Sequence, residues 1–298
     1  MKIVITGTSG FIGSRLLQTA RAAYGESVTA FSSHPSEGNH IVYANRTDFS
    51  LAPTELALVE DAEVLIHAGA FTPKCGAKAN QIKSCNSNIA FTEKLLALPW
   101  RNLKKIIFLS TLDVYANFDG PISEATLTVP TTLYGMSKLY CERMMNLYAL
   151  ERSISIQVLR IGNVFGPGEE KYAKVIPKAI ERIIAGGDVE LWGEGEELRS
   201  FIYISDVVTA ILKAVELQEE PGVINVVGGN VISIRDLLEK LIAIGGRQTK
   251  IMQREFSASP RDLVFDNTKL KGYLLPEESD FTSGLRAEFA HMKSLHKK

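Results

Sequence analysis

Short apolar runs alternate with longer helical patterns through the first half of the chain. Runs of strand type occur at residues 2–6, 27–31, 40–44, 63–67, 105–109 and 154–160. Helical patterns lie between them, at 14–20, 77–98 and 134–150. The continuous apolar run at 105–109 is typical of a parallel strand that is buried on both faces. Strands that alternate with helices in this way predict an α/β fold with a doubly wound parallel sheet.

The pattern changes after Gly162. A turn-rich segment at 163–168 precedes a helix expected at about 173–185, and Ser205 and Asp206 are candidates to cap a helix that runs to about 217. Short strands are expected at 186–195, 200–203 and 222–226, and Ser233 is expected to cap a helix at 234–244. We therefore predict a Rossmann-type domain at 1–162 and a smaller, mixed α/β domain at 163–298, with segments of about 199–226 returning to the first domain.

Three glycines separate the first strand from the first helix. Gly7, Gly10 and Gly13 stand at the spacing Gly-x-x-Gly-x-x-Gly, one residue longer in its first gap than the dehydrogenase fingerprint. Glycines let the backbone approach a pyrophosphate, and the helix N-terminus offers it free N–H donors. Strand, glycine turn and helix in this order predict a dinucleotide site, the alternative being a merely tight turn.

The end of the second strand bears on which dinucleotide is bound. An acidic residue there would hold the ribose 2′-hydroxyl of NAD, but this chain has Ser32, Ser33 and His34. Without a carboxylate, a 2′-phosphate is not repelled, and serine hydroxyls could bind it. These residues favour NADP over NAD. No arginine at the end of this strand confirms a 2′-phosphate site, and Arg15 and Arg46 are candidates for that contact.

Tyr134 and Lys138 stand four residues apart in a helical pattern, and so on one helix face. An ammonium held against a phenol favours the phenolate, so we expect Lys138 to lower the pKa of Tyr134. A phenol tuned in this way can exchange a proton with a carbonyl or alcohol near neutral pH. The alternative is an amphipathic helix with both residues on its solvated face.

Composition narrows the function classes. The 298 residues include 45% apolar and 22% charged residues with a formal net charge of −1, so no nucleic-acid partner is expected. Cys75, Cys85 and Cys141 lack paired spacing, which is typical of a reduced, cytoplasmic protein. The five histidines lack metal-ligand spacing, and no signal peptide or apolar run of ~20 residues is recognised, so neither a metal nor a membrane span is expected.

Several ordered segments resemble the extended short-chain dehydrogenases/reductases, specifically the nucleotide-sugar epimerases, dehydratases and reductases. The resemblance covers nearly the whole chain. The segments that carry it are 6–13, 67–70, 88–92, 109–115, 134–138, 160–168 and 191–207. It implies that the second domain binds the substrate, a nucleotide-diphosphate sugar, and that the protein is a homodimer through helices at about 77–98 and 131–150.

The resemblance also implies roles for individual residues. The catalytic residues would be Thr111, Tyr134 and Lys138. The cofactor would be bound by Gly7, Ser9, Gly10, Phe11, Ile12, Gly13, Ser32, Ser33, Asp48, Ala68, Gly69, Ala70, Asn88, Ser110, Tyr134, Lys138 and Ile161. The substrate would be bound by Thr111, Asn163, Arg199 and Arg261, with the two arginines clamping the diphosphate.

The reaction is narrowed by the two residues after Thr111. Dehydratases of this family carry Asp-Glu there to expel water, whereas this chain has Leu112 and Asp113, and a leucine cannot donate a proton. Two interpretations remain: an NADPH-dependent 4-keto-reductase, which the missing acidic residue after Phe31 favours, and an NAD-dependent 4-epimerase. A rival of another class is a non-catalytic NADP-sensing regulator, against which the intact Tyr134–Lys138 pair argues.

Overall fold

The computed structural model describes residues 1–45, 49–116, 118, 120–246, 248–255 and 261–296. Within these ranges, seven strands form one sheet in the order β10-β6-β5-β4-β1-β2-β3, and all its pairs are parallel. Their bounds are β1 Ile3–Thr6, β2 Val28–Ser32, β3 His40–Val42, β4 Val64–His67, β5 Lys105–Thr111, β6 Ser155–Ile161 and β10 Ile224–Val226. The predicted α/β fold with its parallel sheet is confirmed.

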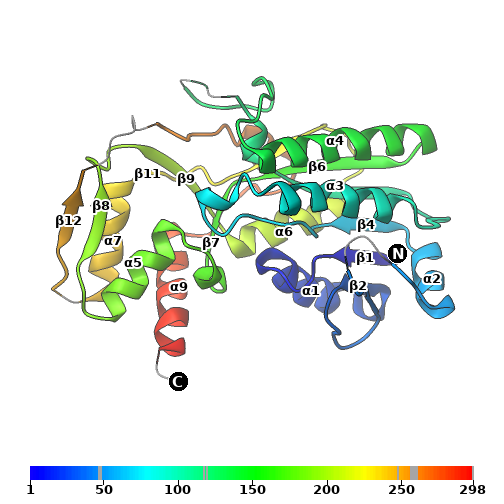
Figure 1. Ribbon diagram of the computed structural model, residues 1–298, viewed down its shortest axis with the longest axis horizontal. Coiled ribbons are helices and arrows are strands. Elements are labelled where there is room, and N and C mark those ends of the chain that lie inside the picture. Colours follow the sequence, from blue (N-terminus) through cyan, green and yellow to red (C-terminus); the bar gives the residue numbers. More distant parts are fainter. Residues whose placement is uncertain (46–48, 117, 119, 247, 256–260, 297–298) are drawn as a thin grey trace.

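Both faces of this sheet are covered by helices (Figure 1). Because strand side chains alternate, Ile3 and Ile5 pack on one face while Val4 packs on the other. One face is covered by α1 Phe11–Tyr24, α6 Ile204–Glu216 and α8 Thr268–Tyr273. The opposite face is covered by α2 Pro53–Glu60, α3 Ile82–Leu96 and α4 Leu133–Arg152. The continuous apolar runs in the sequence reflect this burial from both sides.

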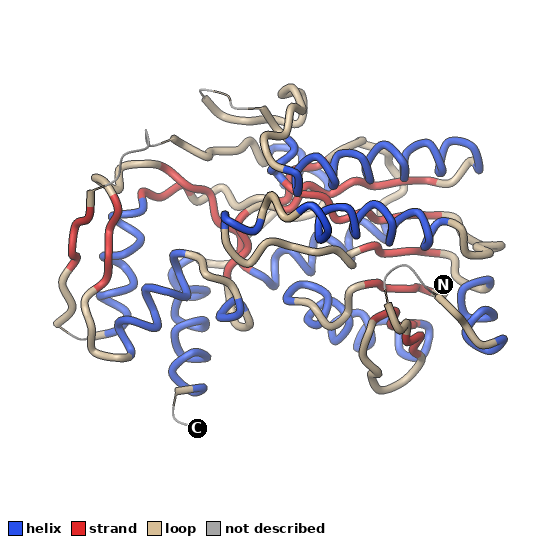
Figure 2. Tube along the Cα trace, in the orientation of Figure 1, coloured by secondary structure: helices blue, strands red, loops and turns tan. Residues whose placement is uncertain are grey.

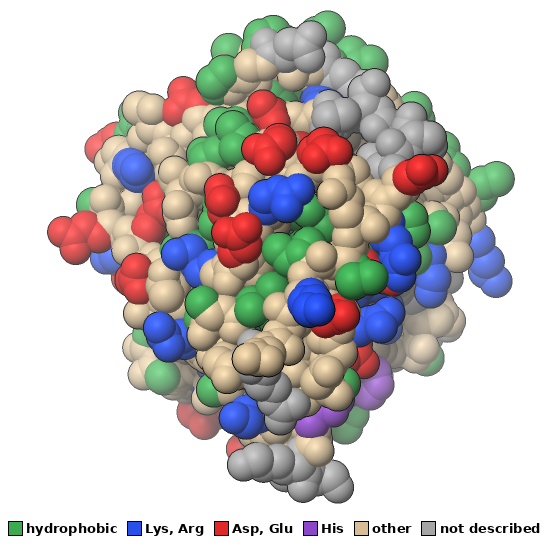
Figure 3. Space-filling model, turned by 90° about the vertical axis from the view of Figure 1, so that its left-hand side faces the viewer, with side chains coloured by type: hydrophobic (Ala, Val, Ile, Leu, Met, Phe, Trp, Pro, Cys, Tyr) green, Lys and Arg blue, Asp and Glu red, His purple; other side chains and the backbone are tan. Residues whose placement is uncertain are grey.

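The chain builds a second, smaller region after β6 (Figure 2). Its strands are β7 Asn163–Phe165, β9 Leu198–Tyr203 and β11 Val231–Ser233 in one sheet, and β8 Val189–Trp192 with β12 Ile251–Arg254 in another. Its helices are α5 Val175–Ile184, α7 Ile234–Gly245 and α9 Phe281–Leu295, which pack around one apolar cluster. Figure 3 looks onto this end of the molecule, where acidic and basic side chains are interspersed.

Most of the predicted elements are present, with a few differences. The helix expected at 173–185 is α5, and Ser233 caps α7 by accepting a hydrogen bond from the Asp236 N–H. The expected Ser205–Asp206 cap is wrong, because α6 begins after Tyr203 without a side-chain cap and the Asp206 carboxylate instead accepts from the Ser279 N–H and hydroxyl. Helix α2 was not predicted.

The residues after β6 are divided between the two regions. Strand β10 pairs with β6 in the large sheet and α6 packs against α1, whereas β9 pairs with β7 and β11 in the smaller region. The domain division at residue 162 stays a prediction. Among the described residues, no helix combines the length and apolar character that crossing a membrane would require.

The strand order reverses beside β1, which has β2 on one side and β4 on the other. The loops after β1 and β4 meet at this point so closely that a Cβ on Gly7, whose φ is +73°, would lie 2.6 Å from the Gly69 Cα atom. A Cβ on Gly13 would lie 2.1 Å from the Gly7 carbonyl oxygen. Such a crevice at the carboxyl ends of the strands is where open α/β sheets bind ligands.

Replacing Gly13 by alanine should destabilise the protein by about 1–3 kcal/mol, because the added methyl group overlaps backbone that cannot move freely. Denaturant unfolding measures this loss. Gly272→Ala is the matched control: this glycine lies in α8 with nothing within 4 Å of the point that a methyl group would occupy, so stability should stay level or rise. Equal stabilities for the two variants would contradict the close packing of the glycine turn.

Candidate active site

A cleft of about 800 Å³ lies at the carboxyl ends of the large sheet. Its walls come from the glycine turn after β1, the loops after β4, β5 and β6, the start of α4, and residues of the smaller region. Among the predicted site residues, those that line it are Gly7, Ser9, Gly10, Phe11, Ile12, Gly13, Ser33, Ala68, Gly69, Ala70, Ser110, Thr111, Tyr134, Lys138, Ile161, Asn163 and Arg261. Segments far apart in sequence thus form one site.

The glycine turn forms one end of the cleft. Gly10 precedes α1 in extended conformation without a side-chain cap, so the first N–H groups of the helix are not covered by a capping side chain. Residues 10–13 line the cleft, and the space a Cβ would occupy at Gly7 and Gly13 is already filled by backbone. This tight turn at a helix N-terminus fits the pyrophosphate of a dinucleotide.

The end of β2 contributes one of its two predicted serines to the cleft. Ser33 lines it, whereas the buried Ser32 hydroxyl lies outside the lining and donates to the His34 carbonyl at 2.6 Å. The predicted Asp48, and Arg46 with it, lie outside the described residues. Ser33 is therefore the side chain at this strand end that can reach a ligand in the cleft.

Asn88 shapes the cleft from behind. Its side chain accepts from the Phe71 N–H at 2.6 Å and donates to the Phe71 carbonyl at 3.2 Å, and it also donates to the Ser137 hydroxyl. Asn88 is not among the lining residues. It ties α3 to Phe71 in the loop after β4 and to Ser137 of α4, and its predicted contact with the cofactor stays a prediction.

Helix α4 carries Tyr134 into the centre of the cleft. The Thr132 hydroxyl caps the helix by accepting from the Gly135 N–H at 3.1 Å. Tyr134 is only 7% exposed, and this remaining exposure is in the cleft wall. Thr72 and Thr111 line the same cleft, and each lowers the pKa of the Tyr134 phenol. A buried phenol in a cleft wall can exchange a proton with an oxygen placed beside it.

Burial dominates the ionisation of Tyr134. Desolvation raises its pKa well above the ordinary value, the Asp113 charge raises it further, and Thr72 and Thr111 only partly oppose this. The Lys138 ammonium donates to the Leu109 carbonyl at 2.6 Å and lies 4.3 Å from the centre of the Phe108 ring. The net shift of the Tyr134 pKa is thus upward, opposite to the expected lowering, while the effect of Lys138 on it stays a prediction.

Asp113 and Lys174 are among the polar cleft residues that were not assigned from the sequence. Asp113 is exposed to the cleft, where desolvation raises its pKa and the Lys174 charge lowers it. Lys174 also lines the cleft and forms an ion pair of 2.9 Å with Glu169. The sequence places Asp113 where dehydratases carry their glutamate. Lys174 lies at the start of the helix expected at about 173–185, and nothing in that local pattern links it to the cleft.

The two predicted arginines differ in position. Arg261 lines the cleft, as does Asn163. Arg199 is not among the lining residues, and its guanidinium donates to the carbonyls of Leu198 and Arg261 at 2.8 and 2.5 Å. Arg199 thus holds the backbone that carries Arg261, and its direct contact with a diphosphate stays a prediction.

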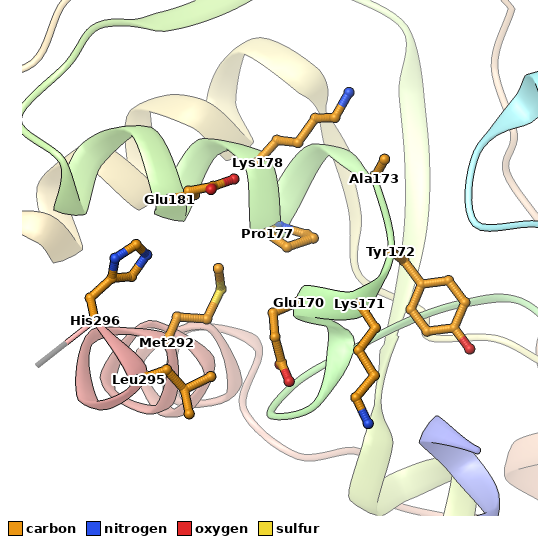
Figure 4. Close-up of a pocket in the computed structure, with 10 residues that line it drawn as sticks. All are labelled: Glu170, Lys171, Tyr172, Ala173, Pro177, Lys178, Glu181, Met292, Leu295 and His296. Atoms are coloured by element: carbon orange, nitrogen blue, oxygen red, sulfur yellow. The ribbon is translucent and has the colours of Figure 1, made fainter. Parts of the chain in front are cut away.

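A second, smaller hollow of about 330 Å³ lies in the smaller region, and Figure 4 shows the residues that line it. It is bordered by the 3₁₀ turn η4 Glu169–Lys171, by α5 and by α9. Its lining includes charged side chains of both signs, the acidic Glu170 and Glu181 and the basic Lys171 and Lys178. None of the predicted catalytic residues lines it, so the chemistry belongs to the large cleft.

A parallel sheet with a glycine turn at its switch point, and a Tyr–Lys helix on the same cleft, define a dinucleotide-binding protein of the short-chain dehydrogenase/reductase type. The family model described as "NAD dependent epimerase/dehydratase family" matches residues 3–227. The chain belongs to this family.

The similar proteins act on nucleotide sugars. The chain is 27% identical to the "Uncharacterized UDP-glucose epimerase YtcB" of Bacillus subtilis, over 99% of each chain. It is 28% identical to the dTDP-4-dehydro-6-deoxyglucose reductase of Escherichia coli, over 80% of each. Its structure resembles a mutant UDP-glucuronic acid 4-epimerase of Bacillus cereus, bound to a fluorinated UDP-glucuronic acid and NAD, with a TM-score of 0.86, 25% identity and coverage of 99% and 100%.

A neutral Tyr134 should not contribute to the alkaline titration of the tyrosines below about pH 10, the ordinary phenol pKa. We expect tyrosinate absorbance to rise equally in the wild type and in Tyr134→Phe up to that pH. One tyrosine fewer titrating in Tyr134→Phe than in the wild type would show that the phenol is activated after all.

Proposed function

We propose that this protein is an NAD(P)-dependent reductase of nucleotide-diphosphate 4-keto sugars. The observation that carries the proposal is the position of the buried Tyr134 phenol, whose pKa is raised by burial, beside Thr111 in the cleft that begins at the glycine turn. Reduction of a ketone requires a proton donor at the carbonyl oxygen, and a neutral phenol is one. The family and the nucleotide-sugar relatives support the substrate class.

Each side chain has a defined part in this reaction. A nicotinamide cofactor, when bound, supplies the hydride that the sugar carbon receives. Tyr134 donates its proton to the sugar oxygen, and Thr111 hydrogen-bonds the same oxygen. Lys138, buried against Leu109 and Phe108, places a positive charge below the reacting oxygen as negative charge develops there.

The two residues after Thr111 support reduction over dehydration. Leu112 and Asp113 both line the cleft, and the leucine has no proton to give to a leaving hydroxyl group. A 4-epimerase remains the second candidate, supported by the 4-epimerase structures that this chain resembles. It would use the same residues, with Tyr134 first accepting and then returning a proton.

The diphosphate is assigned to the end of the cleft formed by the smaller region. Arg261, Lys174 and Asn163 line the cleft there and offer two charges and an amide to phosphate oxygens. Arg199 supports Arg261 through its backbone carbonyl. A sugar held at this end extends toward Tyr134 in the middle of the cleft.

We propose NADP as the preferred dinucleotide. Ser33 lines the cleft at the end of β2, and neither of its neighbours Ser32 and His34 is acidic. A 2′-phosphate therefore meets hydroxyl groups where NAD-specific enzymes place a carboxylate. The structural relatives with bound NAD keep NAD as the alternative.

A homodimer through α3 and α4 is proposed as the assembly. The outer face of α4 exposes apolar side chains at helical spacing, namely Met136, Tyr140, Leu147 and Leu150, which are 48%, 58%, 60% and 78% exposed. Helix α3 packs beside it and exposes Ile82. Two copies of this helix pair would cover these side chains in a four-helix interface.

A cytoplasmic location is proposed from the thiols. Cys75, Cys85 and Cys141 are all free, and two of them are buried. A reducing compartment keeps such thiols from oxidation.

Tyr134→Phe should lower turnover of a dTDP- or UDP-linked 4-keto-6-deoxy sugar with NADPH by about 10²–10⁴-fold, because the proton donor is lost. Dinucleotide affinity should change little, since the glycine turn is untouched. Nicotinamide absorbance follows the reaction. Tyr140→Phe, on the exposed face of the same helix, is the control and should keep full activity.

Full activity in Tyr134→Phe would refute the role of this hydroxyl. Interconversion of two nucleotide sugars without a net absorbance change would identify the 4-epimerase instead of the reductase.

Ser33→Asp should raise the KM for NADPH by about tenfold or more while leaving that for NADH level or lower, because a carboxylate repels a 2′-phosphate and accepts from a 2′-hydroxyl. Ser27→Asp adds the same charge at the amino end of β2 and should leave both values unchanged. If NADH is already the better substrate of the wild type, the preference for NADP is wrong.

A further inference from the structure

Two glutamates with almost no solvent exposure face one another behind the cleft. Glu169 of η4 is 2% exposed and Glu288 of α9 is 0% exposed. The two carboxyl groups are near enough for each to shift the pKa of the other. Two adjacent carboxylates cannot both keep their charge in such a place, as like charges and burial both disfavour it.

The partners of the four carboxyl oxygens indicate where a proton lies. Glu169 Oε1 accepts from the Lys174 ammonium at 2.9 Å, and Glu288 Oε2 accepts from the Gly166 N–H at 2.8 Å. The other two oxygens, Glu169 Oε2 and Glu288 Oε1, are buried and have no donor among the described residues. A single proton placed between these two oxygens would satisfy both of them.

We propose that Glu169 and Glu288 share one proton, and that the singly charged pair positions Lys174 in the substrate cleft. The pair acts through a continuous segment: Glu288 holds the backbone at Gly166, and Glu169 holds the ammonium of Lys174. Neither glutamate lines the cleft, so both are positioning residues. The role of Lys174 as a phosphate contact rests on the function proposed above.

The segment between Gly166 and Lys174 forms part of the cleft wall. The Tyr172 ring lies 6.0 Å from that of Phe11 in the glycine turn, and the Ala173 N–H donates to the Lys74 carbonyl at 2.9 Å. The positive charge of Lys174 lowers the pKa of Asp113, which also lines the cleft. Loss of the shared proton adds a negative charge beside Lys174 and weakens the attraction of the cleft for an anionic diphosphate.

The charged groups that face the pair come from three segments. Besides each other, they are Lys174 before α5 and Glu170 of η4, whose carboxylate in turn lies 3.5 Å from the His291 ring of α9. Burial raises the pKa of both glutamates, and for Glu288 the adjacent Glu169 charge brings it to about 9, although Lys174 opposes this. The proton is thus kept through the neutral range.

The sign of the pH dependence follows from this raised pKa. In the unfolded chain the carboxyl loses its proton near its ordinary value of 4.5, whereas the folded protein keeps it to about 9. The contribution to stability is therefore complete below pH 4.5 and is lost progressively as the pH rises to about 9.

The first test compares the wild type with Glu288→Gln and Glu169→Gln by denaturant unfolding from pH 5 to about pH 9. Either glutamine replaces the shared proton by a permanent amide donor, so neither variant should lose stability with pH as the wild type does. The ratio of wild-type to variant unfolding constants should rise by up to about tenfold per pH unit. Glu181→Gln removes an exposed charge from α5 and should follow the wild type.

The second test measures UDP binding to the same proteins by calorimetry at pH 7 and at about pH 10. The wild type and Glu181→Gln should lose roughly tenfold more affinity than Glu288→Gln, in which the charge beside Lys174 stays constant. Comparison with the variants cancels the titration of UDP itself. Using two glutamine variants guards against one of them failing to fold.

If the free energy of unfolding changes with pH in the same way in the wild type and in a folded glutamine variant, the proposal of a shared proton is wrong. An equal loss of UDP affinity in all four proteins would overturn the positioning of Lys174. If neither UDP nor dTDP binds any of them at pH 7, the proposed substrate class is wrong, and the unfolding curves still decide whether the proton is shared.

Discussion

The hydrogen bond from the Lys138 ammonium to the Leu109 carbonyl ties α4 to the end of β5. A buried lysine charge is costly unless it is held by such a partner, so this contact fixes both the rotation and the depth of the helix. Tyr134 lies one turn earlier on the same face of α4, and its side chain therefore also lines the cleft. The arrangement of the proposed chemistry depends on this one contact between helix and sheet.

The charged groups around Tyr134 in the cleft offset one another. Asp113 raises the pKa of the phenol, Lys174 lowers that of Asp113, and Glu169 neutralises Lys174 from behind. The result is a neutral proton donor on the same helix face as the buried ammonium of Lys138, which the Leu109 carbonyl holds in place. Such an arrangement suits a step in which negative charge appears on a substrate oxygen.

Much of this was predictable from local patterns. Buried parallel strands appear as continuous apolar runs, and the Gly7–Gly13 turn and the Tyr134–Lys138 spacing are short-range features. The sign of the Tyr134 pKa shift was not, because it depends on burial and on Asp113, which the fold brings together. The Asp206–Ser279 and Glu169–Glu288 contacts join residues 73 and more positions apart, beyond the reach of any local pattern.

The central claim is that Tyr134 protonates a sugar oxygen as hydride reaches the adjoining carbon. Its most direct test is a single turnover with NADPH deuterated at the transferable position and a nucleotide-linked 4-keto-6-deoxy sugar, followed by NMR of the product. The account predicts deuterium at the sugar C4 carbon, incorporated about 10²–10⁴-fold more slowly when Tyr134 is replaced by phenylalanine. Deuterium appearing equally fast with the phenylalanine variant, or a keto sugar that is never reduced, would contradict it.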